Sequence, residues 1–565
     1  WILLQPPSSS PFQLECTRDC ICLLSNWEPR KEGTFVLDHI PEKYDFIMIQ
    51  NMRATHVNSE IFEKFERRRL INASETTIEI KKSSIRSITF KDKSSFSSVI
   101  LRDTLLRSIV FGVDSNLREF TVDHCPLEQL PSTLNNLKSL VHLEITRTQI
   151  QAVNLNTLGR LPKLEFLLLS SNRIHSLYYS ADMELFPCLL YFYMQHNQLR
   201  SINFNLFNTM TSLTDINLRN NSLTTVSGAL VSSSVNSVEL TNNHLISLDC
   251  CGWRLPRLVR FDVTNNKLES LPRCLERTLT NASIIRLANN RLHLDEMERF
   301  RTFTQLEIID LSLNMLSSVT LSKETLPPNL HMLNLSKNRL QSITMPYTSN
   351  SKRVTVDVSD NCISQFKLDD VPKEIYDLLM FRALVSNSLS SFLLTNNQLS
   401  SLDCCGWQLP RLHRFDVANN KLESLPRCLE QTLTNASMML FANNRLHLDE
   451  MERFRSFTQL EVINLSQNIL SSVTLSKETL PPNLYMLNLA KNRLQSFAVP
   501  YSPNAELRVD VSDNCIKSFD VKEVSKDLHQ LLMFNNPIDC TLQYDVLAMF
   551  ESNRSSNCVY TTATC

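Results

Sequence analysis

Apolar residues recur along this chain in one spaced phrase rather than in long blocks. Each copy of the phrase begins with three aliphatic residues: two residues separate the first from the second, and one residue separates the second from the third. An asparagine follows after two more residues, and a further aliphatic residue follows one residue after the asparagine. The alternation in the middle of the phrase predicts a short strand whose aliphatic side chains point to one side. Clear copies are Leu164-x-x-Leu167-x-Leu169-x-x-Asn172-x-Ile174 and Leu213-x-x-Ile216-x-Leu218-x-x-Asn221-x-Leu223.

The asparagine of the phrase predicts the turn that ends each strand. Its amide can bond backbone groups that would otherwise be left unpaired inside the protein. One such unit cannot bury its own apolar face, so successive units must stack and their asparagines form a ladder. Thr148, Cys125, Thr104 and Ser83 hold the same place in weaker units. The predicted ladder is Asn172, Asn197, Asn221, Asn243, Asn266, Asn290, Asn314, Asn338, Asn361, Asn397, Asn420, Asn444, Asn468, Asn492, Asn514 and Asn536.

This spacing is that of the leucine-rich repeat, whose period is roughly 20–29 residues. The predicted fold class is an α/β solenoid, a leucine-rich repeat horseshoe of about 20 turns with a parallel β-sheet on the concave face and cysteine-bearing caps. The predicted segments are a signal remnant or linker (1–15), an N-terminal cap with irregular first turns (16–70), repeats (71–227), two copies of a duplicated repeat block (228–381 and 382–534) and a C-terminal cap (535–565).

The duplicated block predicts an irregularity at its seam. The stretch from Asn290 to Phe300 returns unchanged 154 residues later, and the ladder position of Asn536 corresponds to Ala383. The next ladder asparagine, Asn397, follows only 14 residues after Ala383, which is too short for one turn. Either residues 376–397 form one irregular turn, or the solenoid kinks there, or two neighbouring genes were joined in error. We expect a distorted turn around residues 365–395.

Four cysteines of the duplicated block predict two disulfides. Cys251 and Cys274 each lie eight residues after a ladder asparagine, so they occupy equivalent positions on adjacent turns, roughly 5 Å apart. Cys405 and Cys428 repeat this arrangement in the second copy.

The remaining cysteines of the block have other expected roles. Cys250 and Cys404 are alternatives to the cysteines that follow them, since the strand boundary decides which side chain points toward the neighbouring turn. Cys362 and Cys515 are expected to be buried small apolar groups. No histidine stands at ligand spacing from the double cysteines, so we expect no metal site there.

Composition and motifs exclude several functions. The chain has 57 Lys and Arg and 58 Asp and Glu, a formal net charge of −1, which argues against a nucleic-acid surface and a polybasic anchor. The 6 glycines leave little material for phosphate-binding loops. No apolar run is long enough to predict a membrane span. No catalytic motif is present, so we expect no enzyme activity and no cofactor.

The outward strand positions of the duplicated block carry the candidate partner-binding residues. They line the predicted concave face, on which many solenoids bind other molecules. Arginine and aspartate mix there, and they either read a charged protein surface or pair with each other across strands. The candidates are Arg260, Asp262, Arg286, Asp310, Arg414 and Asp416.

Cysteine usage and sequons favour an extracellular protein. The 16 cysteines suit an oxidising compartment, where Asn-x-Ser sequences are glycosylated. Asn334 and Asn464 fall on the concave face, so their glycans would shift binding to the N-terminal turns, an edge or the outer side. The glycosylation candidates are Asn72, Asn220, Asn281, Asn334, Asn435, Asn464 and Asn553.

The repeats from Ile78 to Phe534 are nearly free of glycine and contain phrases such as Leu164-Glu-Phe-Leu-Leu-Leu-Ser-Ser-Asn172. In these features the chain resembles secreted insect leucine-rich repeat proteins and, among them, the mosquito leucine-rich immune family. Both ends extend the resemblance to extracellular leucine-rich repeat caps. The cap candidates are Cys16, Cys20 and Cys22 at the front, whose pairing stays open, and Cys540 with Cys558 or Cys565 at the back.

The resemblance implies a role in innate defence through binding thioester-containing proteins or other leucine-rich repeat proteins. We therefore expect a secreted protein-binding protein of immune recognition or complement-like complex assembly. The alternative is the ectodomain of a Toll-like or cell-adhesion receptor. The odd cysteine at the final residue indicates a truncated end, a bridge to another chain, as in a disulfide-linked dimer, or a free thiol. Neither a nucleic-acid partner nor a membrane span in this chain is expected.

Overall fold

The structure, a computed structural model, describes residues 11–17, 21–41, 45–67, 76–158, 161–180, 186–321, 325–344, 354–363, 389–405, 407, 409–517 and 519–538. The chain divides into two compact units, Trp1–Ala282 and Ser283–Cys565. Their boundary falls inside the first copy of the duplicated block, so the units are not the two copies. Each unit is described by itself.

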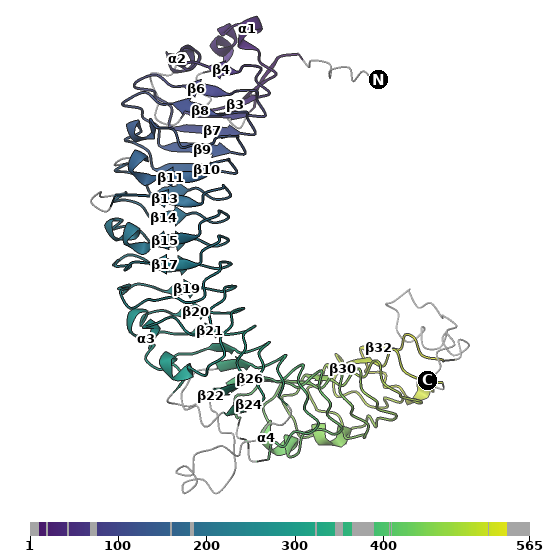
Figure 1. The fold of residues 1–565 in the computed structure, drawn as a ribbon. Helices are drawn as coiled ribbons and strands as arrows, with labels where there is room; N and C mark the ends of the chain where they lie inside the picture. The colour runs from purple at the N-terminus through teal and green to yellow at the C-terminus, as the bar shows by residue number, and fades with distance from the viewer. Residues whose placement is uncertain are drawn as a thin grey trace, which may run out of the picture. The chain divides into compact units, whose positions relative to one another are not determined.

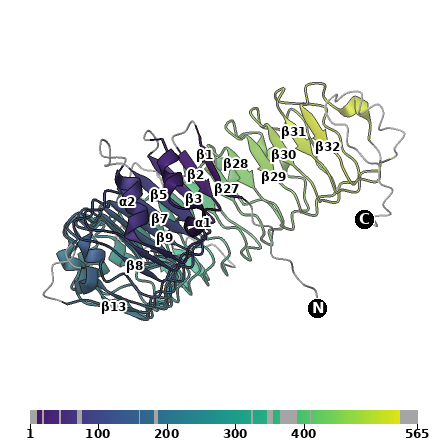
Figure 2. The ribbon, with the colours of Figure 1, turned by 90° about the horizontal axis from the view of Figure 1, so that it is seen from above.

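Unit 1 is built around a parallel sheet to which each turn contributes one strand (Figure 1). Neighbouring strands pair with equivalent residues opposite one another, as Leu143, Leu167 and Phe192 do on three successive turns. Seen from above, β5, β7 and β9 lie side by side (Figure 2). The strands are β2 (Ile21–Ser25), β3 (Phe46–Gln50), β5 (Thr77–Lys81), β7 (Ser98–Arg102), β9 (Glu119–Asp123), β10 (His142–Thr146), β12 (Phe166–Leu168), β14 (Tyr191–Tyr193), β16 (Asp215–Asn217), β18 (Ser237–Glu239) and β19 (Arg260–Asp262).

Unit 2 repeats this arrangement with its own parallel strands. Its strands are β20 (Ile284–Arg286), β21 (Ile308–Asp310), β23 (Met332–Asn334), β25 (Val354–Asp357), β26 (Leu389–Leu393), β27 (Arg414–Asp416), β28 (Met438–Leu440), β29 (Val462–Asn464), β30 (Met486–Asn488), β31 (Arg508–Asp510) and β32 (Gln530–Leu532).

The return path of each turn is mostly irregular, with short strands and little helix in the described residues. The short strands are β4 (His56–Val57), β6 (Ser87–Thr89), β8 (Ser108–Val110), β11 (Ala152–Asn154), β13 (Ser176–Tyr178), β15 (Ser201–Asn203), β17 (Thr225–Ser227), β22 (Ser318–Thr320) and β24 (Ser342–Thr344). The α-helices are α1 (Pro29–Glu32), α2 (Ser59–Arg67), α3 (Leu275–Thr278) and α4 (Leu429–Thr432). The fold is thus the predicted leucine-rich repeat solenoid.

The predicted asparagine ladder is present, and it is buried except at its half-buried last rung, Asn536. Asn197 shows the bonding: its Nδ2 donates to the carbonyls of Leu169 (2.9 Å) and Met194 (3.0 Å), and its Oδ1 accepts from the Ile174 amide (3.0 Å). One side chain therefore satisfies backbone groups of two turns. The weaker predicted rungs Ser83, Thr104, Cys125 and Thr148 are also buried, with at most 5% of each exposed.

The residue before each rung adopts the left-handed backbone conformation. Its φ is +53° at Asn220, +56° at Asn242 and +61° at Asn265. Asparagine tolerates this region better than most residues. These three side chains also bond to one another, so a second, more exposed row of amides runs beside the buried ladder.

At the predicted seam the ladder passes directly from Asn361 to Asn397. The Asn397 Nδ2 donates to the Val358 carbonyl (3.2 Å), and its Oδ1 accepts from the Ile363 amide (3.1 Å). β25 pairs with β26, and the register shifts between Val354 and Thr355. These contacts make Asn361 and Asn397 neighbouring rungs, which supports the prediction of one irregular turn at the seam. Residues 364–388 lie outside the described residues.

The structure forms both disulfides that the repeat spacing predicts. Cys251 pairs with Cys274 in unit 1, and Cys405 pairs with Cys428 in unit 2. The alternative cysteines, Cys250 and Cys404, are buried instead. In each double cysteine, the second residue therefore forms the disulfide to the next turn, and the first residue is buried.

Two other cysteines differ from the prediction. Cys362 is exposed and Cys515 is disulfide-bonded, so neither is a buried apolar group. Both follow a rung whose side chain points inward, and their own side chains therefore leave the core.

The N-terminal cap begins with a hairpin. β1 (Gln13–Cys16) pairs antiparallel with β2, and a disulfide joins Cys16 to Cys22. β2 then pairs in parallel with β3, so the regular sheet begins at this point. The predicted cap cysteines Cys20, Cys540 and Cys558 lie outside the described residues.

Candidate functional site

The exposed face of the sheet consists of the first and third residues of each short strand. The middle residue points into the core, as the buried Leu167 and Phe192 show between their half-buried neighbours. This face is the surface on which the predicted partner-binding residues were placed. The structure puts Arg260 and Asp262 in unit 1 and the others in unit 2.

The three aspartates predicted to bind a partner instead stabilise the turns of the solenoid. Asp262 and Asp416 are each only 5% exposed and accept bonds from the backbone amides of Thr264 (3.0 Å) and Ala418 (3.2 Å). Asp310 accepts in the same way from the amide and the hydroxyl of Ser312. Each carboxylate thus stabilises the turn that ends its own strand.

Two of the three predicted arginines, Arg260 and Arg414, are held by these carboxylates. Arg414 Nη2 lies 2.8 Å from Asp416 Oδ2, and Arg260 Nη2 lies 3.6 Å from Asp262 Oδ2. These pairs form within one strand, whereas the pairing considered from the sequence runs across strands. Arg260 Nε additionally reaches Glu239 Oε1 on the neighbouring strand at 3.4 Å. These contacts explain the Arg–Asp mixing without a partner.

A row of aromatic rings lies on the exposed face of three neighbouring strands of unit 1, β10, β12 and β14. Figure 1 labels the first and the last of these three strands. His142, Phe166 and Tyr191 are opposite one another on β10, β12 and β14. Their rings stack, with centroids 5.3 Å apart for the first pair and 4.9 Å for the second. Tyr193 meets Tyr191 edge to face at 5.8 Å. We call His142, Phe166, Tyr191 and Tyr193 the aromatic stripe.

Carboxylates border the aromatic stripe. Glu119 lies opposite His142 at one end, and Asp215 lies opposite Tyr191 at the other. Neither carboxylate has an ion pair among the described residues. Burial, and then the charges of Asp215 and Glu239, raise the pKa of Tyr193 above its usual value. Part of this rise in pKa comes from the Asp215 and Glu239 carboxylates, so negative charge lies beside the rings.

The aromatic stripe was not among the sequence candidates, although a signal for it exists. His142, Phe166 and Tyr191 each stand six residues before a predicted rung, at Thr148, Asn172 and Asn197. Equal distance from successive rungs places side chains next to each other on adjacent strands. An aromatic residue at this place on three consecutive turns therefore predicts a row of rings.

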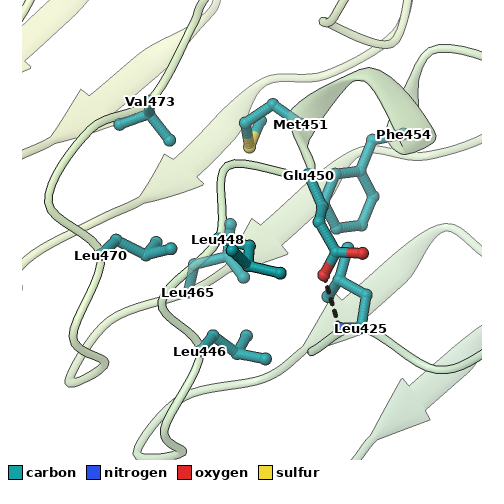
Figure 3. A pocket seen from close by; sticks show the side chains of 9 residues that line it. All are labelled: Leu425, Leu446, Leu448, Glu450, Met451, Phe454, Leu465, Leu470 and Val473. Carbon is teal, nitrogen blue, oxygen red and sulfur yellow. Dashed lines mark hydrogen bonds between the residues drawn. The ribbon is translucent and has the colours of Figure 1, made fainter. Parts of the chain in front are cut away.

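A small hollow in unit 2 is a weaker candidate (Figure 3). Leucines, Met451, Phe454 and Val473 line it, and its volume is about 10 Å³, the lower limit for one water molecule. Its one carboxylate, Glu450, accepts a bond from the Leu425 amide at 2.7 Å and another from Arg453 at 2.8 Å. That carboxylate is therefore occupied in holding two turns together.

The described residues contain no group of three or more histidine, cysteine or acidic side chains that could hold a metal ion. In the same part of the chain, no helix is long and apolar enough to cross a membrane.

Residues 81–253 match the sequence model of a family described as leucine-rich repeat region. The chain is 36% identical to oligodendrocyte-myelin glycoprotein of Homo sapiens over 110 residues, which is 19% of this chain and 24% of that protein. It is 30% identical to podocan of Mus musculus over 138 residues, 23% of this chain and 22% of that protein. The chain thus spans about a quarter of the length of these relatives.

Among solved structures, a chain of the Toll–Spatzle complex of Drosophila matches with a TM-score of 0.47 at 15% identity. The match covers 90% of this chain and 90% of that chain.

Proposed function

We propose that this chain is an extracellular protein-binding leucine-rich repeat protein, and that a protein partner docks on the aromatic stripe of unit 1. The observation that carries the proposal is the stack of half-exposed rings on the open face of a sheet, bordered by carboxylates. Aromatic side chains are enriched where proteins bind one another because they bury large areas with few rotatable bonds.

The chemistry of the stripe specifies the partner. The rings of Phe166 and Tyr191 offer a flat apolar surface, and Glu119 and Asp215 place negative charge at its two ends. A partner segment that carries an apolar side chain flanked by lysine or arginine complements both features. The guanidinium of an arginine can also stack on the tyrosine rings.

The disulfides support the extracellular part of the proposal. Cys251–Cys274 and Cys405–Cys428 require an oxidising compartment, and a relative that matches part of the chain is named as a glycoprotein. The resemblance to the mosquito leucine-rich immune family supports the finer proposal that the partner belongs to innate defence, as a thioester-containing protein or another leucine-rich repeat protein.

The test compares three immobilised proteins: the full chain, its Phe166→Ala/Tyr191→Ala variant and a Tyr178→Ala variant. Each is incubated with extracellular fluid of the source organism, and retained proteins are identified by mass spectrometry. We expect a protein that the full chain and Tyr178→Ala retain and the double variant loses. Its affinity for the double variant should fall by roughly 30-fold or more, the size of a binding hot spot.

Tyr178 is the matched control because it is an exposed aromatic residue on β13, away from the sheet face. Raising the salt concentration should weaken the interaction, because the proposed charge pairs are partly solvated. If all three proteins retain the same partners with equal affinity, the stripe is not the binding site.

A further inference from the structure

The exposed sheet face of unit 2 carries two apolar stripes, one in each copy of the duplicated block. On three consecutive strands of the first copy, Ile284, Ile308 and Met332 lie opposite one another. In the second copy the equivalent residues are Met438, Val462 and Met486. Met332 is 38% exposed and Met486 is 41% exposed, whereas Val462, between Met438 and Met486, is 7% exposed and therefore buried. We call these the copy 1 stripe and the copy 2 stripe.

A sequon borders each stripe. Asn334 follows Met332 by two residues on β23, and Asn464 follows Val462 by two residues on β29. Residues two apart on a strand point to the same face, so each asparagine stands beside the stripe of its own copy. The sequences Asn334-Leu-Ser336 and Asn464-Leu-Ser466 are glycosylation acceptors.

The copies differ in where the sequon lies. The residue equivalent to Asn334 is Asn488, but Ala490 replaces the serine that a sequon needs. The residue equivalent to Asn464 is Asp310, which has no amide. Each copy therefore has one sequon on this face, on a different strand. Asn334 shares β23 with the exposed Met332, whereas Asn464 shares β29 with the buried Val462 and lies between the strands of Met438 and Met486.

The side-chain amides of Asn334 and Asn464 are oriented so that a sugar can be attached to Nδ2 without breaking a hydrogen bond. Asn334 Oδ1 accepts from the Ser336 amide (3.1 Å) and hydroxyl (2.7 Å), and Asn464 Oδ1 accepts from the Ser466 amide (3.0 Å). Among the described residues, neither Nδ2 donates to any group. By contrast, the Nδ2 of Asn435, another sequon, donates to the Pro410 carbonyl at 2.7 Å. The Nδ2 atoms of Asn220 and Asn281 are also hydrogen-bonded, to His196 and to the Pro256 carbonyl. The remaining sequons, Asn72 and Asn553, lie outside the described residues.

We propose that Asn334 and Asn464 carry N-linked glycans and that the first sugars of each glycan cover the apolar stripe of that copy. A sugar ring presents polar edges and an apolar face of C–H groups, so it can lie on methionine and isoleucine while its hydroxyls stay in water. The disulfides support this proposal, because such bonds form in the oxidising compartment in which these glycans are attached.

The modification consumes an activated sugar. A bond forms between Nδ2 and the anomeric carbon of an oligosaccharide carried on a lipid diphosphate. The bond between that carbon and the diphosphate oxygen breaks, the lipid diphosphate leaves with the electron pair, and one amide proton passes to a base. No oxidant or reductant is involved.

The first measurement is site occupancy on the full chain secreted from eukaryotic cells. Proteolytic peptides are analysed by mass spectrometry before and after enzymatic removal of N-glycans. We expect glycans on the peptides with Asn334 and Asn464 and none on the peptide with Asn488. Unmodified Asn334 and Asn464 would overturn the proposal.

The second measurement tests the covering. Dilute peroxide oxidises exposed methionine to its sulfoxide, and the rate at each methionine is followed by mass spectrometry. Asn334→Asp should accelerate oxidation of Met332 several-fold, and Asn464→Asp should do the same for Met438 and Met486. Both variants should fold, because the natural Asp310 makes the same turn contacts.

Met315 is the internal control, since it is 36% exposed and lies outside both stripes, so its rate should stay constant. Ser336→Ala and Ser466→Ala provide second variants that remove the sequon and keep the asparagine, and Ala490 is the natural precedent for this change. Glycosylated asparagines with unchanged oxidation rates would overturn the covering role.

Discussion

Each ladder asparagine joins two turns, and this makes it the residue on which the solenoid depends. Asn338 donates from Nδ2 to the carbonyls of Leu311 and Leu335, both at 3.0 Å, and accepts from the Leu316 amide at 3.1 Å. All these backbone groups lie where water cannot replace a missing partner. A smaller polar residue can hold the position, as Thr148 does, with its hydroxyl and its amide both donating to Oδ1 of Asn172 on the next turn.

The residue before the rung is constrained by its backbone. Leu313 occupies this place with φ +56° and is 45% exposed, so its side chain gains little from burial while its Cβ crowds the left-handed backbone. We expect Leu313→Asn to raise the free energy of unfolding by about 1 kcal/mol, measured from the midpoint of chemical denaturation.

The control for this prediction is Leu294→Asn. Leu294 is 54% exposed and does not have a positive φ, so replacing it changes polarity without relieving the backbone. A gain of equal size in both variants would mean that solvation, and not the left-handed conformation, determines the effect.

At the scale of elements, the disulfides fasten neighbouring turns. Cys405 and Cys428 are 23 residues apart, and closing a loop of this length stabilises a protein by about 3 kcal/mol in the chain-entropy view. We expect Cys405→Ser/Cys428→Ser to lose stability of this order in unit 2, measured by chemical denaturation. Cys188→Ser, which changes an exposed free cysteine, should have no effect. An unchanged midpoint in the double variant would contradict a stabilising role.

Cys404 does not compete for this disulfide. Its side chain is buried, and burial raises the pKa of the thiol to about 11. The thiolate needed for exchange is therefore scarce at neutral pH. Its Sγ lies 2.8 Å from the Arg427 carbonyl, which fixes the side chain inside the turn.

The elements were predictable where one repeat position determines one role. The rungs and the strands follow from spacing alone, because equivalent positions on adjacent turns must be neighbours. Spacing also predicted a disulfide to Cys274, but the choice of Cys251 over Cys250 came from the structure. Cys362 and Cys515 were predicted wrongly because burial depends on which side of the turn a residue faces. Asp262 and Asp416 were predicted to bind a partner because they are charged. Their burial and their bonds to backbone amides depend on the conformation of the turn, which the sequence pattern does not give.

At the scale of the whole molecule, a solenoid lacks long-range contacts between distant turns. Each turn packs on its neighbours, so stability is close to a sum of terms from single turns and adjacent pairs. This explains how a block of turns could be duplicated: each copy brings its own core, ladder and disulfide. It also explains why the open sheet faces of the copies could diverge while the core leucines were retained.

This architecture predicts that a destabilising substitution in one turn affects that turn and its neighbours and leaves distant turns unchanged. Asn338→Ala leaves the buried Leu316 amide without its partner, while the Leu311 and Leu335 carbonyls keep the bonds from Asn314 and Asn361. Losing the partner of one buried group costs about 1–3 kcal/mol. Amide hydrogen exchange of the full chain should therefore accelerate by roughly 5- to 150-fold in β21, β23 and β25, because local opening there becomes less costly. Exchange in β12 and β14 of unit 1 should stay as in the unaltered chain. Asn483→Ala, which removes an exposed amide with one bond to the Thr458 carbonyl, is the control and should change neither region. Equal acceleration in both units would show that the chain opens as one cooperative body, which a sum of neighbouring turns does not allow.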